Sequence, residues 1–139
     1  MNVDFFMNEA LIEANKAFLS NEIPVGAILV ENHTQKIISR NYNQMHKHNN
    51  PIKHCEINLI LETCEKLKQK YLDNMTMFVT LEPCTMCASA ISKAHIETLY
   101  FGAYDEKNGG IEKIRAAFER KNIFVPNIYG GIMEHKCSK

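Results

Sequence analysis

Two short motifs constrain this chain more than any other feature. His54 and Glu56 form an H-x-E motif, and Cys84 and Cys87 belong to a P-C-x-x-C motif further along the chain. A structural zinc site is usually closed by four protein ligands, whereas a catalytic site keeps one position open for water. His54, Cys84 and Cys87 supply three ligands. Glu56 is then free to move protons beside the open position, so the motifs predict a hydrolytic zinc site.

The second motif is expected at the start of a helix. Pro83 suits that position because its missing N–H is harmless there. Cys84 and Cys87 would then lie in the first turn and face the same way. The positive end of the helix dipole favours the thiolates that bind metal. Two thiolates and one imidazole suit a single Zn²⁺ per subunit, although iron could use the same ligands.

Length and composition predict one globular domain over residues 1–139. A chain of this length can bury a substantial core. The apolar fraction of 45% and the charged fraction of 23% argue against disorder. The formal net charge is zero. Because nucleic-acid binders usually carry a basic excess, this balance disfavours a large RNA footprint but leaves room for a local basic patch.

The sequence also predicts a cellular compartment. Residues 1–6 lack the basic and apolar segments of a signal peptide, and no stretch approaches the ~20 apolar residues of a membrane-spanning helix. The five cysteines are an odd number, and two of them form the C-x-x-C motif. This usage suits a metal in a reducing compartment better than a set of disulfides. We therefore expect a cytoplasmic protein without a membrane segment.

Alternating helix and strand patterns predict an α/β fold with three layers, α/β/α, around a central mixed five-stranded sheet. The first two strands should form a hairpin, and the strand before the P-C-x-x-C motif should be central. Ligands of open α/β sheets bind beyond the carboxyl ends of strands, where this motif falls. The predicted helices cover residues 4–19, 54–68, 111–119 and the segment after Cys84, and the predicted strands cover 25–30, 36–42, 75–81, 96–101 and 127–132.

Apolar spacing gives expectations for two helices. Asp4 can cap the first helix, which should bury one apolar face. In the helix after His54, a step of roughly 100° turns Cys55 away from the metal ligand, so Cys55 should pack in the core. The predicted buried positions are Met7, Ala10, Leu11, Ala14, Ala17 and Phe18 in the first helix, and Ile57, Ile60, Leu61, Cys64 and Leu67 in the second.

The two motifs are the signature of zinc-dependent nucleobase deaminases. Further stretches resemble the bacterial tRNA adenosine deaminases of the cytidine deaminase superfamily: residues 24–27, Asn43, and Phe101 to Asp105. The resemblance runs from about Ala10 to Gly131. It implies a cytidine-deaminase-like fold and conversion of adenosine to inosine at the wobble position of a tRNA anticodon stem-loop. It also implies a homodimer in which the neighbouring subunit borders each site.

The resemblance implies roles for three further residues. Asn43 matches an amide that hydrogen-bonds the purine, although a strand-end asparagine can simply form a turn. Asp105 matches a residue near the target ribose, although it could be an ordinary loop carboxylate. Gly26 allows close approach of either the bound base or a packed helix. Tyr104 departs from the arginine common in the family, which weakens any inferred contact with phosphate or flanking bases.

Two other segments leave alternatives open. The loop 44–53 carries His46, Lys47, His48 and Lys53, which could contact substrate phosphates or could be solvated without a role. Residues 133–137 resemble the start of a helix, where the related family has a longer terminal helix that helps to bind tRNA. This helix is therefore expected to be short or truncated here.

Two rival functions compete with tRNA deamination. The first is a small-molecule deaminase acting on guanine, cytosine or a nucleotide, which the neutral net charge, Tyr104 and the short terminal helix favour. The second is a non-enzymatic interaction module stabilised by zinc. Glu56 argues against this second alternative, because a structural site has no use for a carboxylate two residues after its histidine.

Overall fold

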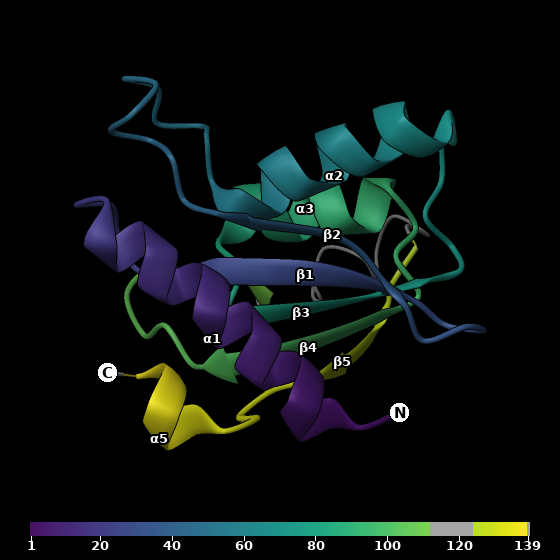
Figure 1. Ribbon diagram of the computed structural model, residues 1–139. Helices are drawn as coiled ribbons and strands as arrows, with labels where there is room; N and C mark the ends of the chain where they lie inside the picture. Colours follow the sequence, from purple (N-terminus) through teal and green to yellow (C-terminus); the bar gives the residue numbers. More distant parts are fainter. Residues whose placement is uncertain (112–123, 139) are drawn as a thin grey trace.

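The computed structural model describes residues 1–111 and 124–138, and its sheet has the predicted mixed arrangement of five strands. The strand order is β2-β1-β3-β4-β5 (Figure 1). The β1–β2 and β1–β3 pairs are antiparallel, and the β3–β4 and β4–β5 pairs are parallel. The strand before the P-C-x-x-C motif, β3, is therefore central. The strands are β1 (Gly26–Glu31), β2 (Ile37–Tyr42), β3 (Met75–Leu81), β4 (Thr98–Ala103) and β5 (Asn127–Tyr129).

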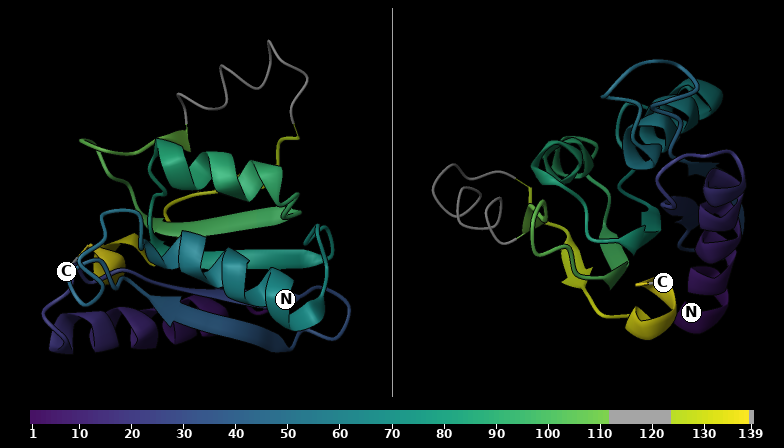
Figure 2. Two further views of the ribbon diagram at one scale, coloured as in Figure 1. Left: turned by 90° about the horizontal axis from the view of Figure 1, so that it is seen from above. Right: turned by 90° about the vertical axis from the view of Figure 1, so that its left-hand side faces the viewer.

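Helices cover both faces of the sheet, which gives the three predicted layers. The helices α2 (Cys55–Leu67) and α3 (Thr85–Lys93) lie on one face, and α1 (Val3–Leu19) and α5 (Glu134–Cys137) lie on the other (Figures 1 and 2). No helix within the described residues is long and apolar enough to cross a membrane. The helix predicted over residues 111–119 lies outside the described residues, apart from Ile111.

The central strands are buried on both faces, which explains their continuous apolar sequences. In β1, Ala27 and Leu29 pack into the core on the α2 and α3 side. Ile28 and Val30 pack into a second core with Phe6 and other side chains of α1. This alternation follows from the two-residue period of a strand. The metal-ligand helices are thus fixed to a sheet that is filled on both sides.

Helix α1 differs from the prediction at both ends. The N-cap is Asn2, not Asp4, because the Asn2 Oδ1 accepts a hydrogen bond from the Phe5 N–H at 3.1 Å. Phe18 was predicted to be buried, but 65% of it is exposed. The adjacent Ala17 is fully buried, and the helical step of roughly 100° turns Phe18 outwards.

The buried face of α2 is rotated from the predicted one. Cys55, Leu59 and Thr63, four residues apart, are fully buried on the sheet, as expected for Cys55. Leu61 and Leu67 were predicted in the core, but they are 60% and 37% exposed. Thr63 tolerates burial because its hydroxyl donates to the Leu59 carbonyl at 2.7 Å. The apolar spacing of α2 therefore marks two surfaces, of which the sheet covers one.

Strand β4 begins and ends later than predicted, because Gly102 does not terminate it. A Cβ at Gly102 would lie 2.3 Å from the Sγ of Cys137. The glycine therefore lets α5, the helix predicted to start near residue 133, pack closely against β4. Strand β5 ends at Tyr129, earlier than the predicted residue 132. Gly131 has a left-handed φ of 80°, and the Ile132 N–H then donates back to the Phe101 carbonyl at 3.1 Å.

Candidate metal centre

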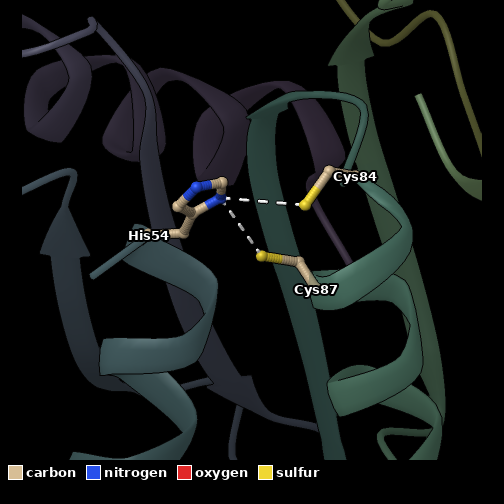
Figure 3. Close-up of side chains that lie close together, drawn as sticks. All are labelled: His54, Cys84 and Cys87. Carbon is tan, nitrogen blue, oxygen red and sulfur yellow. Dashed lines mark hydrogen bonds between the residues drawn. The ribbon is translucent and has the colours of Figure 1, made fainter. Parts of the chain in front are cut away.

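Three predicted metal ligands converge from the starts of two neighbouring helices. His54 is the N-cap residue of α2, and Cys84 is the N-cap residue of α3. Cys87 follows in the first turn of α3 and is fully buried. The imidazole and the two thiols point toward one another (Figure 3). The predicted pairing of the two motifs is therefore present in the fold.

The spacing of these side chains fits a metal ion. The Nδ1 atom of His54 lies 3.8 Å from the Sγ of Cys84 and 3.6 Å from the Sγ of Cys87. All three ligand atoms lie within 4.8 Å of one another. Zinc bond lengths and tetrahedral angles place nitrogen and sulfur ligands roughly 3.6 Å apart. The cluster can therefore hold a metal without moving its helices, and one histidine with two cysteines suits zinc.

The thiols and the imidazole influence one another's protonation. A hydrogen bond from the Cys87 thiol, together with His54, lowers the pKa of Cys84 to about 4. The same hydrogen bond to Cys84, together with burial, raises the pKa of Cys87. The hydrogen bond with Cys84 raises the pKa of His54 despite its partial burial. Cys84 is thus the thiol of the pair that ionises more readily, and both cysteines would hold a metal as thiolates.

Glu56 is buried beside the ligands, with only 4% of its surface exposed. Burial raises the pKa of its carboxyl group, although hydrogen bonds to its own backbone and to Cys55 oppose the shift. The Cys55 thiol donates to the Glu56 Oε1 atom at 3.2 Å. A carboxyl group with a raised pKa can both accept and return a proton near neutral pH.

A cavity of about 350 Å³ opens on the metal-ligand cluster. This volume lies within the range of small-molecule sites. His54, Glu56 and Cys84 contribute to its wall, and Asn43 and Asp105 line it as well. Six further residues complete the lining: Ile23, Val25, Met45, Leu81, Glu82 and Asn108.

Asn43 is 4% exposed and is fixed to the start of α2. Its Oδ1 atom accepts a hydrogen bond from the Cys55 N–H at 2.9 Å, and its own N–H donates to the Val25 carbonyl at 3.1 Å. Because the side-chain oxygen is engaged, the NH₂ group is left to donate to a ligand in the cavity. The alternative of a simple turn former does not explain this tie to the helix that carries Glu56.

Asp105 lines the cavity, but its carboxylate mainly organises its own loop. Its Oδ1 atom accepts hydrogen bonds from the N–H groups of Lys107 and Asn108 at 3.2 and 3.0 Å. Its own N–H donates to the Glu82 carboxylate at 3.0 Å. Asp105 therefore lines the cavity, as a substrate-binding residue would, and its carboxylate also holds its own loop.

Gly26 does not line the cavity. A Cβ atom at this position would lie 2.3 Å from the Ala14 nitrogen and 2.4 Å from the Ala10 oxygen, both in the backbone of α1. The missing side chain therefore lets α1 approach β1. Of the two alternatives for Gly26, helix packing accounts for the glycine, and direct approach of a ligand has no support here.

The polar loop 44–53 is held by a buried carboxylate that the sequence did not mark. Glu22 is 6% exposed and accepts hydrogen bonds from the N–H groups of His46 at 3.0 Å and Lys47 at 2.8 Å. The His46, Lys47 and His48 side chains are exposed. A single glutamate between two elements shows no periodicity, so no sequence pattern could have identified this anchor.

Comparisons with known proteins show the family of this chain. The sequence pattern of the MafB19-like deaminase family matches residues 1–136. A tRNA-specific adenosine deaminase of Rickettsia bellii is 45% identical over 127 residues, which are 91% of this chain and 88% of that protein.

Two solved structures resemble the fold. A chain from structural studies of A-to-I editing by tRNA:A34 deaminases is 40% identical and superimposes with a TM-score of 0.89 over 96% of both chains. A guanine deaminase from Nitrosomonas europaea has a TM-score of 0.81, with 16% identity over 97% of this chain and 80% of that one. The second likeness concerns the fold alone.

Proposed function

Because this chain belongs to the family of the tRNA-specific adenosine deaminases, we propose that it converts adenosine to inosine at the wobble position of tRNA. The observation that carries the proposal is the buried Glu56 beside His54 and Cys84 on the wall of one cavity. The substrate of this chain is then the anticodon stem-loop. The related proteins named above support this choice over a free nucleobase.

His54, Cys84 and Cys87 would hold one Zn²⁺ per subunit, in agreement with their spacing and donor chemistry. When bound, zinc supplies a Lewis acid that lowers the pKa of water from about 16 towards 7. Cys84 contributes to this site as a thiolate before the ion binds, since its pKa is about 4. The structural alternative, a zinc module without activity, leaves the buried Glu56 without a role.

Glu56 is the proton carrier in this proposal. It accepts a proton from the attacking water and delivers it to the adjacent ring nitrogen as the oxygen bonds to C6. It then passes the second proton of the water to the amine while the C6–N6 bond breaks. Ammonia leaves and inosine remains, so one water is consumed. A carboxylate that performs both transfers contributes about 10²- to 10⁴-fold to the rate.

Asn43 orients the base while the other walls exclude water. Its side-chain oxygen is held by the Cys55 N–H, so its NH₂ group donates to the purine. Apolar side chains of Ile23, Val25 and Leu81 line the same cavity and provide surface for an aromatic ring. Asp105 lines the same cavity and would lie near the target ribose, as the resemblance to the family implies.

We further propose that the chain acts as a single-domain homodimer in the cytoplasm, where its tRNA substrate is processed. The outward face of α2 supports the homodimer, because Leu61 and Leu67 are exposed there. An apolar helix face that its own sheet does not cover is suited to a subunit interface.

The test is inosine formation in an anticodon stem-loop with adenosine at the wobble position. Wild-type protein and Glu56→Gln protein, each with measured zinc content, would be compared. We expect inosine from the wild type, and a rate at least about 10²-fold lower from the variant with its zinc retained. Free adenine, guanine and cytosine would be assayed in parallel for ammonia release. Ammonia from a free base without inosine in the stem-loop would assign the chain to the small-molecule deaminases.

A further inference from the structure

The cavity wall formed by loop 103–110 is tied to the metal-ligand turn through backbone contacts and one carboxylate. We propose that Glu82 is a positioning residue that docks this loop onto the start of α3 and thereby fixes the substrate side of the cavity. The proposal rests on the proposed function, because that function places the substrate in this cavity.

Glu82 stands between β3 and the turn that carries the cysteine ligands. Its N–H donates to the Ala103 carbonyl at 2.8 Å, and its Oε1 atom accepts from the Asp105 N–H at 3.0 Å. The side chain is half-buried and lines the cavity. Glu82 therefore holds the loop at two successive points, one through its backbone and one through its carboxylate.

Two glycines show how closely the loop approaches this turn. A Cβ atom at Gly109 would lie 2.4 Å from the Oε1 of Glu82. A Cβ atom at Gly110 would lie 2.2 Å from the Thr85 nitrogen, and the Gly110 N–H donates to the Pro83 carbonyl at 2.9 Å. Only glycine permits this contact, so the loop is in direct backbone contact with the turn.

This contact joins the metal side and the substrate side of the cavity. Gly109 forms an isolated β-bridge with the ligand Cys84. On the same loop, Asp105 and Asn108 line the cavity, and the Asp105 carboxylate accepts the Asn108 N–H. Together with these backbone contacts, the Glu82 carboxylate thus holds the wall that faces the substrate against the metal-ligand turn. Its loss should weaken substrate binding more than it slows the chemical step.

The alternative is a direct contact between the Glu82 carboxylate and the substrate, since Glu82 also lines the cavity. Glu82→Gln separates the two roles. The glutamine side chain keeps an oxygen that can accept the Asp105 N–H, but it lacks the negative charge. A positioning role is rescued by this variant, whereas a role that needs the charge is not.

The experiment compares Glu82→Ala, Glu82→Gln and Gly109→Ala with the wild type in the stem-loop assay. Glu106→Ala serves as the matched control, since it removes an exposed carboxylate from the same loop. We expect Glu82→Ala and Gly109→Ala to raise KM about tenfold with kcat changed less than about threefold. Glu82→Gln and Glu106→Ala should stay within about threefold of wild type in both constants.

A second readout does not depend on activity. Hydrogen exchange measured by NMR reports whether the Asp105 N–H is hydrogen-bonded. Its acceptor is the Glu82 carboxylate, which the Glu82→Ala substitution removes. We expect its exchange to accelerate at least about tenfold in Glu82→Ala and to stay near wild type in Glu82→Gln. Unchanged exchange in Glu82→Ala, or equal KM losses in the alanine and glutamine variants, would overturn the proposal. An inactive wild type would instead refute the proposed function, and the exchange result would still decide whether Glu82 holds the loop.

Discussion

His54 and Cys84 occupy helix N-cap positions, where a side chain normally hydrogen-bonds the first N–H groups of its own helix. Each is an N-cap residue with extended backbone, and neither makes a side-chain hydrogen bond to its helix. N-cap positions usually carry serine, threonine, aspartate or asparagine, which satisfy the first N–H groups. Here both helices give up that contact, and the side chains point toward each other instead. Placing ligands at helix starts also puts the positive end of each helix dipole beside the thiolate.

The surroundings of Glu22 predict that the stability of the folded protein depends on pH. Burial alone would raise its pKa, but hydrogen bonds from the His46 and Lys47 N–H groups and the charges of His46 and His48 together lower it below the ordinary value of 4.5. Because the folded pKa is depressed, the stabilisation is present above pH 4.5 and is lost as pH falls through the folded pKa. We expect Glu22→Gln to be less stable than the wild type at pH 7 in urea denaturation.

The difference between Glu22→Gln and the wild type should shrink as the pH falls from 7 towards 3. Glu106→Gln, which changes an exposed loop carboxylate, is the control and should follow the wild-type curve. A gap between wild type and Glu22→Gln that stays constant over this range would contradict the assignment of Glu22 as the ionised anchor of the loop.

The sequence could predict functional residues inside a motif better than functional residues outside one. His54, Cys84 and Cys87 could be identified because their spacing has few uses other than metal binding. Glu22 could not, because it is a single carboxylate whose partners are backbone N–H groups of a distant loop. Glu82 directly precedes Pro83 of the second motif, but its hydrogen bond with the Asp105 N–H could not be predicted either. Such partners depend on the tertiary fold, and backbone groups leave no trace in the amino-acid sequence.

A substitution at Gly26 tests the packing of α1 against β1. In Gly26→Ala, the new Cβ would meet the α1 backbone at Ala14 and Ala10, so the helix must shift. Overpacking of this kind costs about 1–3 kcal/mol, and we expect that loss in the free energy of unfolding measured with urea. If Gly26 served the substrate, Gly26→Ala would raise KM and leave the unfolding free energy unchanged.

The fold class was easier to predict from the sequence than the buried face of each helix. Alternating strand and helix patterns identified the mixed sheet and its central strand. In α2, however, Leu59 and Leu61 are equally apolar, and only Leu59 meets the sheet. Periodicity gives the positions that avoid water but not the partner that covers each of them. The exposed face of α2 therefore led to an incorrect prediction of the core.

That exposed face leads to a prediction for the whole molecule. Leu61→Asp places a charge on the proposed homodimer interface, and we expect a shift to monomer in sedimentation analysis. Ile12→Asp is the matched control, because Ile12 is also an exposed apolar residue, at 48%, and lies on α1 across the sheet. It should remain dimeric. A wild type that is monomeric at the assay concentration, or an equal effect of both substitutions, would reject α2 as the interface.

Metal removal tests how the site contributes to the stability of the whole chain. The three ligands join the starts of α2 and α3, so an ion bound to the folded protein opposes unfolding of both. At a zinc concentration 100-fold above Kd, this linkage is worth about 2.7 kcal/mol. For a chain of this size, that free energy corresponds to a rise of roughly 10 °C in Tm over the chelator-treated protein.

Two variants make the metal prediction specific to the ligands. Glu56→Gln leaves the three ligand side chains in place, so its Tm should still rise with zinc. Cys87→Ala removes the fully buried ligand, and its Tm should respond little to zinc or chelator. If chelation removed the metal and left the wild-type Tm unchanged, the ion would not be coupled to the packing of the two helices. If zinc raises the Tm of the wild type and of Glu56→Gln but not that of Cys87→Ala, the stabilisation comes from the ligands that join α2 and α3.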